Sequence, residues 1–333
     1  MRLPKFECFY PKTVDEACAF LAEHKDQTRI IAGGTDLVVA LKQRRTLPQH
    51  LLNLKSIPDL SLISYDQKTG LSIGALATLD DVARNPEIKK LYPSLSQAAS
   101  RVAAPQIRNK GTIGGNVALD SRCWYYNQSE FWRSTRPACF KAGGDCCYVV
   151  KGGKQCYSLI SADTVPALIT LDASVELVSK AGSRVVAVEK LYTGIGQTPN
   201  VIKADEILTR VLVPASSLKG VYIKHAYRGA IDFPLIGVAV SLSLNGGNTV
   251  EDVRIAIGAA TPAPVRAVKA EAVLKGKALS DELLAEAGQV ATKEVTPIVH
   301  IFAPVAYKRK MVEVLLKRAV GAANREQGIG SRE

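Results

Sequence analysis

Five cysteines lie close together in the middle of this 333-residue chain, which has seven in all. Four thiolates are what an iron–sulfur cluster needs as ligands. Adjacent cysteines cannot easily face one small cluster together, so Cys146 and Cys147 are expected to supply a single ligand between them. The sequence therefore predicts a [4Fe–4S] cluster held by Cys123, Cys139, Cys147 and Cys156, with Cys146 as a packed spare thiol.

Three other interpretations of these cysteines remain open. Zinc sites normally use pairs of the C-x2-4-C type, whereas 15, 7 and 8 residues separate the four predicted ligands. Disulfides are rare in cytosolic proteins, where thiols stay reduced. Unliganded structural cysteines are the third possibility, although a loop containing Gly143-Gly144 and Gly152-Gly153 is a poor place to bury five thiols.

Two glycine-rich strings flank a possible phosphate site. The first is AGGTD from Ala32 to Asp36, and the second is GTIGGN from Gly111 to Asn116. Glycine lets an anion approach unpaired backbone N–H groups closely, and the Thr and Asn side chains can donate to phosphate oxygens. Neither string is a Rossmann fingerprint or a Walker A loop. Each alone is more typical of a tight turn, but two strings about 80 residues apart favour a shared phosphate site.

Alternating helical and strand patterns surround these strings. In residues 1–57 we expect a helix capped by Thr13 and Glu16 in a capping box, and a strand that ends at the first glycine string. In residues 58–216 we expect a strand at 70–75, a helix capped by Thr78, and a helix from Leu91 to Ala103. The segment at about 121–158 interrupts this second unit.

The pattern changes after residue 216. Alternating strands at 221–227, 237–244 and 250–258, with a turn at 245–248, indicate an antiparallel sheet. Helical periodicity follows from Arg266. We therefore expect a C-terminal α+β domain at 217–325 and a tail at 326–333.

Composition excludes several classes of protein. The net charge of +12 is dispersed and aromatic residues make up only 6% of the chain, so nucleic-acid binding is not expected. No apolar run is long enough to span a membrane, and the first residues lack a signal peptide, so a cytoplasmic location is expected. The four histidines are scattered, and no catalytic constellation is predicted in this chain.

Three ordered motifs carry a family resemblance: Ala32–Leu37, Gln106–Asn116 and Ala256–Ala267. They resemble the FAD-binding medium subunit of the xanthine dehydrogenase family of molybdenum hydroxylases. The resemblance implies an α+β fold, in which a two-subdomain α/β FAD-binding domain precedes the C-terminal sheet-and-helix domain. It also implies FAD extended between the two subdomains, with its pyrophosphate on the glycine strings.

The resemblance transfers the family's FAD contacts to particular positions of this chain. Residues 31–37 would wrap the pyrophosphate and ribose, and Ala103, Thr112 and residues 114–116 would complete the floor of the site. Leu208 would pack against the adenine side, and Lys224 would approach the flavin ring. The positions implied are Ile31, Ala32, Gly33, Gly34, Thr35, Asp36, Leu37, Ala103, Thr112, Gly114, Gly115, Asn116, Asp163, Leu208 and Lys224.

In most members of the family the Gly-Gly-Asn string runs directly into the Asp-x-x-Pro element, whereas about forty residues intervene here. This insertion resembles the 4-hydroxybenzoyl-CoA reductase branch. That branch implies an FAD and [4Fe–4S] electron-transfer subunit that works with a large molybdenum-cofactor subunit and a small subunit carrying two [2Fe–2S] clusters, in a dimer of heterotrimers. Ferredoxin is the expected electron donor, because six basic and two acidic residues lie between Arg122 and Cys156. The alternative is the FAD subunit of a hydroxylating dehydrogenase that passes electrons to NAD or a quinone.

Overall fold

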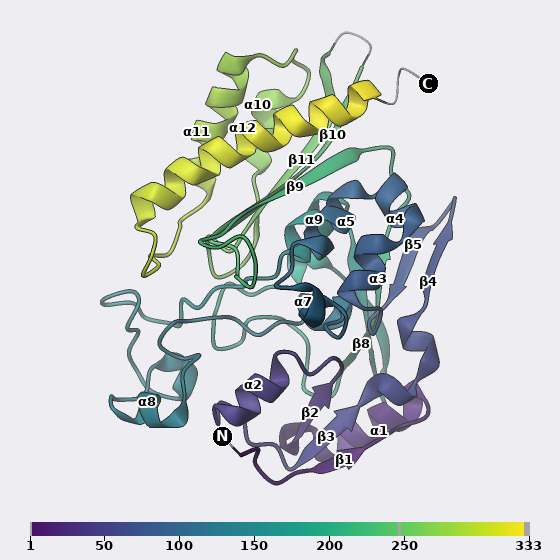
Figure 1. The fold of residues 1–333 in the computed structure, drawn as a ribbon, viewed down its shortest axis with the longest axis vertical. Coiled ribbons are helices and arrows are strands. Elements are labelled where there is room, and N and C mark those ends of the chain that lie inside the picture. Colours follow the sequence, from purple (N-terminus) through teal and green to yellow (C-terminus); the bar gives the residue numbers. More distant parts are fainter. Residues whose placement is uncertain (1, 246–247, 330–333) are drawn as a thin grey trace.

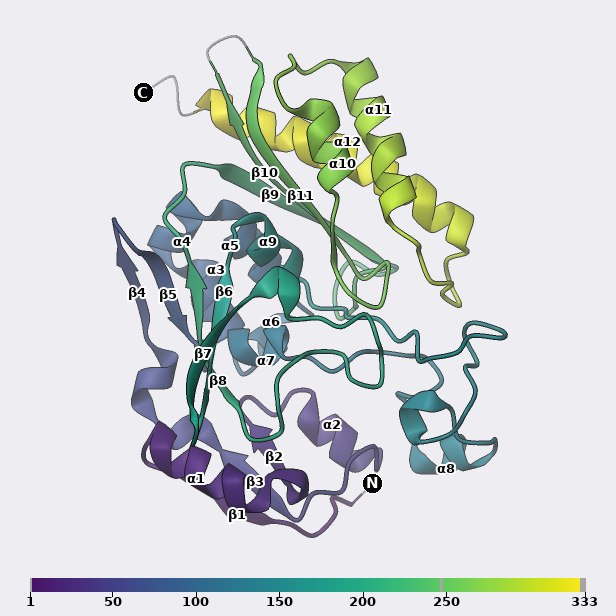
Figure 2. The same cartoon turned by 180° about the vertical axis from the view of Figure 1, so that it is seen from behind.

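The computed structural model describes residues 2–245 and 248–329. Within them the chain forms three sheets, each covered by helices (Figure 1). The small parallel sheet and the larger antiparallel sheet form the two halves of an N-terminal domain, and the third sheet with its helices forms a C-terminal domain (Figure 2). The predicted α+β fold is confirmed.

The first subdomain is a parallel three-stranded sheet in the order β1-β3-β2. Its elements are β1 (Glu7–Phe9), α1 (Val14–His24), β2 (Thr28–Ile31), α2 (Leu37–Lys42) and β3 (His50–Asn53). Ala17, Leu21 and Leu52 are buried between α1 and the sheet. The first glycine string is the link from β2 to α2, which places it at the carboxyl end of a parallel strand, where ligands of such sheets bind.

The predicted capping box of α1 forms only in part. The Thr13 side chain accepts from the Glu16 amide, at 3.1 Å, as predicted. The Glu16 carboxylate accepts from the Lys12 amide, at 2.7 Å, one residue before the N-cap. The helix α3 has the complete reciprocal box, between Thr78 and Asp81.

The second subdomain is built on an antiparallel sheet in the order β4-β5-β8-β6-β7. Its strands are β4 (Ile63–Asp66), β5 (Gly70–Gly74), β6 (Ser174–Ser179), β7 (Gly182–Ala187) and β8 (Ile207–Val213). Its helices are α3 (Leu79–Arg84), α4 (Pro86–Leu91), α5 (Pro93–Ser100), α6 (Pro105–Arg108), α7 (Ile113–Val117), α8 (Glu130–Ser134) and α9 (Thr164–Thr170).

The helix expected from Leu91 to Ala103 is present as α5, but it is shorter than predicted. The helix α4 ends at Leu91, and Pro93 begins a new helix that ends at Ser100. Tyr92 has φ −131° and ψ 56°, because a proline disfavours helical geometry in the residue before it. Ala103 then adopts a positive φ of 43°, which directs the chain past the end of the helix.

The cysteine segment projects from the second subdomain and packs beside α2 of the first (Figures 1 and 2). Reciprocal backbone hydrogen bonds between Arg122 and Leu159 close its base. Arg133 fixes its outer part by donating to the carbonyl oxygens of Gln43 and Arg44, just after α2. The insertion is therefore attached to both subdomains of the N-terminal domain.

The C-terminal domain is an antiparallel sheet in the order β12-β11-β10-β9, with three helices. The elements are β9 (Lys219–His225), β10 (Ile236–Leu244), β11 (Val250–Gly258), β12 (Val265–Arg266), α10 (Val268–Leu274), α11 (Asp281–Glu294) and α12 (Val305–Ile329). The predicted antiparallel pairing is confirmed, whereas residues 246–247 of the predicted turn lie outside the described residues. The helix α12 continues past 325, so the predicted tail begins inside a helix.

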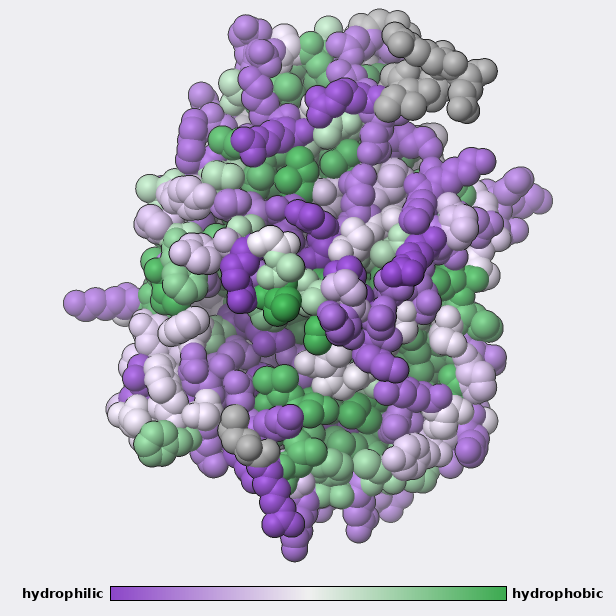
Figure 3. All heavy atoms as spheres, viewed as in Figure 1, coloured by the Kyte–Doolittle hydropathy of each residue, from purple (hydrophilic) through white to green (hydrophobic). Residues whose placement is uncertain are grey.

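Surface hydrophobic atoms gather over α2 on the face that Figure 3 shows. Val39 of this helix is 42% exposed, and Leu47 just beyond it is 59% exposed. Across residues 2–245 and 248–329, no helix combines the length and apolar character needed to cross a bilayer.

Candidate functional site

A cleft of about 800 Å³ runs between the two subdomains of the N-terminal domain and reaches the loop after β9. Most of the residues to which the resemblance assigns FAD contacts line this cleft. They are Ala32, Gly33, Gly34, Thr35, Asp36, Leu37, Ala103, Thr112, Gly114, Gly115, Asn116, Asp163 and Leu208. Ile31 and Lys224 are not part of its wall. Their roles, like those of the others, stay predictions.

The two glycine strings contact each other along one wall of the cleft. A Cβ on Gly33 would lie 1.9 Å from the carbonyl oxygen of Lys110, and one on Gly114 would lie 2.6 Å from the Cβ of Ala75. Neither distance can be accommodated without backbone movement. Gly33 is therefore required for packing the two strings together, and Gly114 for packing the second string against Ala75 at the end of β5.

Polar side chains of the second string have partners within the fold. Thr112 caps α7 by accepting from the amide of Gly115, at 3.1 Å. The Oδ1 of Asn116 accepts from the hydroxyl of Thr164, at 2.6 Å. These bonds fix the string as a rigid surface facing the cleft.

Asp163 and Lys224 meet where the N-terminal and C-terminal domains join. The carboxylate accepts from Lys224 Nζ at 3.0 Å and from the Tyr222 hydroxyl at 2.7 Å. Burial raises the pKa of Asp163 to about 6, and Lys224 and Tyr222 oppose that shift. Lys224 also donates to the carbonyl oxygens of Arg101 and Asp232, so it cross-links the two domains.

The sequence interpretation missed cleft residues that come from the insertion and from the loop after β9. Arg122 pairs with Asp36 and lies over the ring of Phe233, with 4.4 Å between guanidinium and ring centroid. Arg122, Phe233 and Tyr126 all line the cleft. Arg122 directly precedes the first cysteine, but no motif marks it as facing the cleft. Phe233 lies just beyond the Lys224 motif, in an irregular loop.

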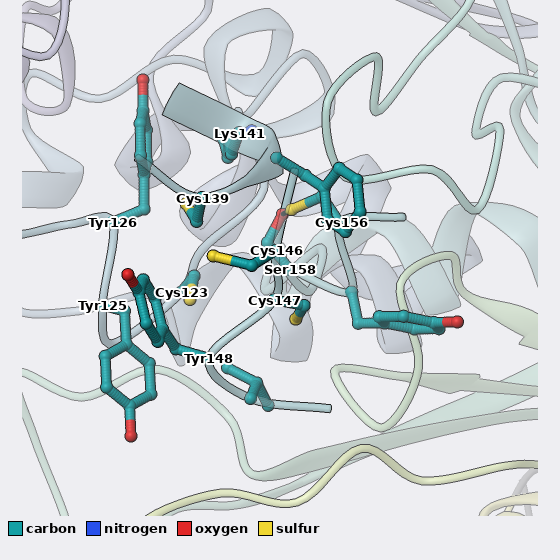
Figure 4. Close-up of a pocket in the computed structure, with 13 residues that line it drawn as sticks. Cys123, Tyr125, Tyr126, Cys139, Lys141, Cys146, Cys147, Tyr148, Cys156 and Ser158 are labelled. Carbon is teal, nitrogen blue, oxygen red and sulfur yellow. Dashed lines mark hydrogen bonds between the residues drawn. The ribbon is translucent and has the colours of Figure 1, made fainter. Parts of the chain in front are cut away.

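All five clustered cysteines line a second, small cavity in the insertion (Figure 4). Tyr125, Tyr126, Tyr148 and Lys141 complete much of its wall. The Cys147 sulfur accepts from the amide of Val150, at 3.4 Å, whereas the Cys146 thiol donates to the carbonyl oxygen of Ala138, at 3.6 Å. The two adjacent cysteines therefore differ in their hydrogen bonding.

The thiols are close enough to influence one another. Burial raises the pKa of Cys123, amides of Tyr126 and Tyr125 lower it, and Cys156 and Cys139 raise it further. The free volume between the side chains of this cavity is about 20 Å³. Among the described residues, no three His, Cys, Asp or Glu side chains are arranged to hold a single metal ion.

Lys141 anchors the cysteine cavity to the rest of the protein. Its buried ammonium donates to Asp120 at 2.7 Å, to the Ser121 hydroxyl at 2.7 Å and to the Gly196 carbonyl oxygen at 2.6 Å. Tyr126, which lies 5.5 Å from that ammonium, borders both the cysteine cavity and the cleft. One side chain thus separates the two spaces at this point.

Comparison with known proteins identifies the cleft-bearing domain. Residues 4–216 match the family described as the FAD binding domain in molybdopterin dehydrogenase. The chain belongs to this family. Residues 221–323 match the CO dehydrogenase flavoprotein C-terminal domain. The chain is therefore an FAD-binding oxidoreductase subunit of the molybdenum hydroxylase type.

Individual relatives extend over nearly the whole chain. It is 29% identical to the nicotinate dehydrogenase FAD-subunit of Eubacterium barkeri, with 94% of each protein covered. It is 28% identical to the nicotine 6-hydroxylase medium subunit of Paenarthrobacter nicotinovorans, with 96% of this chain and 98% of the relative covered. The solved carbon monoxide dehydrogenase of Hydrogenophaga pseudoflava matches with a TM-score of 0.81 at 28% identity, covering 97% of this chain and 98% of that one.

Proposed function

We propose that this chain is the FAD and [4Fe–4S] electron-transfer subunit of a molybdenum-containing 4-hydroxybenzoyl-CoA reductase. The observation that carries the proposal is the convergence of five cysteines on one cavity that shares Tyr126 with the FAD cleft. A subunit that only held FAD would not need a thiol cavity beside it. The adjacency supports electron passage between the two sites.

Four thiolates are the donor set that a four-iron cluster requires. A cubane binds each thiolate through a different iron atom, so its ligands stand further apart than the ligands of one zinc ion. Bound here, such a cluster supplies single electrons, and its four thiolates would come from Cys123, Cys139, Cys147 and Cys156.

The amide donors support the choice of ligands. Backbone N–H groups that point at cysteine sulfur stabilise the thiolate form. Cys147 has such a donor in Val150, and Cys123 has donors in Tyr125 and Tyr126. Cys146 instead donates its own proton to a carbonyl oxygen, as a spare thiol would.

The reaction itself belongs to a partner subunit. Two electrons and two protons convert 4-hydroxybenzoyl-CoA to benzoyl-CoA and water, with the phenolic C–O bond broken. In this chain the cleft would bind FAD and the cysteine cavity would receive electrons from a donor. We also propose a cytoplasmic location, where the thiols stay reduced.

We propose a large molybdenum-cofactor subunit and a small subunit with two [2Fe–2S] clusters as partners, in a dimer of heterotrimers. The relatives named medium subunit or medium chain support such an assembly. The exposed hydrophobic surface over α2 suits a subunit contact.

Ferredoxin is the proposed electron donor, but only part of the positive charge of the insertion is available to attract it. Arg122, Arg133 and Lys141 of the insertion are engaged within the protein. Lys151 and Lys154 remain exposed and would carry most of the attraction to an acidic donor.

A hydroxylating dehydrogenase is the second candidate, and the names of the relatives favour it. Nicotinate dehydrogenase and nicotine 6-hydroxylase are both among the similar proteins. In that function electrons would leave through FAD to NAD or a quinone, and the extra cluster would act as a relay.

The two functions are separated by assaying the anaerobically purified complex. The reductase proposal predicts that a reduced low-potential donor drives the formation of benzoyl-CoA from 4-hydroxybenzoyl-CoA. Failure of that reaction, together with NAD- or quinone-dependent hydroxylation of an aromatic substrate, would establish the second candidate.

A further inference from the structure

Arg122 occupies a fixed position at the base of the cysteine segment. Its backbone N–H donates to the Leu159 carbonyl oxygen at 2.7 Å, and its carbonyl oxygen accepts from the Leu159 amide at 2.9 Å. These bonds close the insertion at its root. The position of Arg122 therefore depends on how the segment joins the domain rather than on the loop tip.

The side chain of Arg122 reaches from this root into the FAD cleft. Its guanidinium pairs with Asp36, the residue that follows the Gly33-Gly34-Thr35 string. The ring of Phe233 lies 4.4 Å from the guanidinium carbon and restrains the plane of the group. The insertion, the first subdomain and the loop after β9 thus meet at one arginine.

Two guanidinium nitrogens in this part of the cleft have no hydrogen-bond acceptor among the described residues. Arg122 Nε is buried and has no hydrogen-bond partner among the described residues, and the same is true of Nη2 of Arg45. Both arginines line the cleft. Buried guanidinium donors without acceptors are unfavourable, and an anion beside them would supply the missing acceptors.

We propose that Arg122 binds the pyrophosphate of FAD, so that the cysteine segment forms part of the flavin site. A planar guanidinium fixed by Asp36 and Phe233 presents donors in the geometry that phosphate oxygens accept. Arg45 adds a second positive charge nearby. The proposal rests on FAD binding alone and is independent of the group that the cysteines hold.

FAD titrations of the flavin-depleted full chain, followed by quenching of flavin fluorescence, test the proposal. Arg122→Gln should weaken FAD binding by about tenfold to a hundredfold, the range expected for losing a charge-assisted hydrogen bond. Arg136→Gln is the matched control, because Arg136 lies in the same segment over Trp132, outside the cleft wall. It should bind FAD like the wild type.

Arg122→Lys provides a second test if the glutamine variant does not fold, since lysine retains the charge. With FAD bound at saturation and the protein oxidised, the pyrophosphate ³¹P resonances of Arg122→Lys should be shifted from those of the wild type. The visible spectrum of the flavin ring should be the same in both proteins. Wild-type FAD affinity in either variant would overturn the proposal, as would unchanged ³¹P resonances. Cluster content measured in the same samples keeps this result separate from the proposed function.

Discussion

Asp163 and Lys224 form a buried ion pair across the junction of the two domains, with 3.0 Å between carboxylate and ammonium and side-chain exposures of 4% and 7%. Removing one partner of such a pair leaves an uncompensated buried charge. Lys224→Met should therefore reduce the free energy of unfolding by about 3–5 kcal/mol, measured by urea denaturation.

An exposed pair serves as the control for that measurement. Lys310→Met removes a surface pair with Glu313 and should change the free energy of unfolding by less than about 1 kcal/mol. Adding Asp163→Asn to Lys224→Met should recover part of the loss. Equal effects of the Lys224 and Lys310 substitutions would contradict a structural role for the buried pair.

The raised pKa of Asp163, about 6, gives a pH dependence of known sign. Between the unfolded value near 3.8 and about 6, the native state binds a proton that the unfolded chain does not. This group therefore adds stability as the pH falls through that window, and the contribution is lost as the pH rises above 6. Infrared spectra should show a protonated carboxyl appearing near pH 6, absent in Asp163→Asn; titration only near pH 4 would refute the shift.

Gly33→Ala should damage the fold and FAD binding together. The new Cβ would collide with the Lys110 carbonyl oxygen, and overpacking of this kind typically destabilises by about 1–3 kcal/mol. Flavin absorbance per protein should fall along with the melting temperature. Gly229→Ala, where a Cβ meets nothing within 4 Å, should keep both at wild-type values. Full flavin content in Gly33→Ala would show that the strings do not need their close contact.

Cys147, the proposed cluster ligand, can be compared directly with Cys146, the adjacent thiol that is proposed not to bind the cluster. Cys147→Ser should lose most of the bound iron, whereas Cys146→Ser should keep it, because Cys147 accepts an amide hydrogen bond at sulfur and Cys146 donates to a carbonyl oxygen instead. Iron analysis after anaerobic purification decides between them. Loss of iron from Cys146→Ser with retention in Cys147→Ser would reverse the assignment.

Local patterns predicted much of the fold because they are short-range signals. Thr78 with Asp81 defines a helix start, and the alternation in residues 250–258 defines a strand. The helix expected across Leu91–Ala103 was placed too early, because Pro93 restricts Tyr92 and begins a separate helix.

The candidate site was predictable only where motifs mark it. The glycine strings led directly to the cleft wall, and the clustered cysteines led to the second cavity. Arg122 and Phe233 were missed because their roles come from tertiary contact between distant segments. The approach of Lys224 to the flavin stays a prediction; within the protein its ammonium donates to Asp163 and to two carbonyl oxygens.

The most direct test of the central claim is quantitation of iron, acid-labile sulfide, zinc and flavin in the full chain purified anaerobically. We expect about four iron and four sulfide per FAD, as one [4Fe–4S] cluster requires. Zinc without sulfide, or FAD with neither metal, would contradict it and would leave the cysteine segment as a structural element of an FAD-binding subunit.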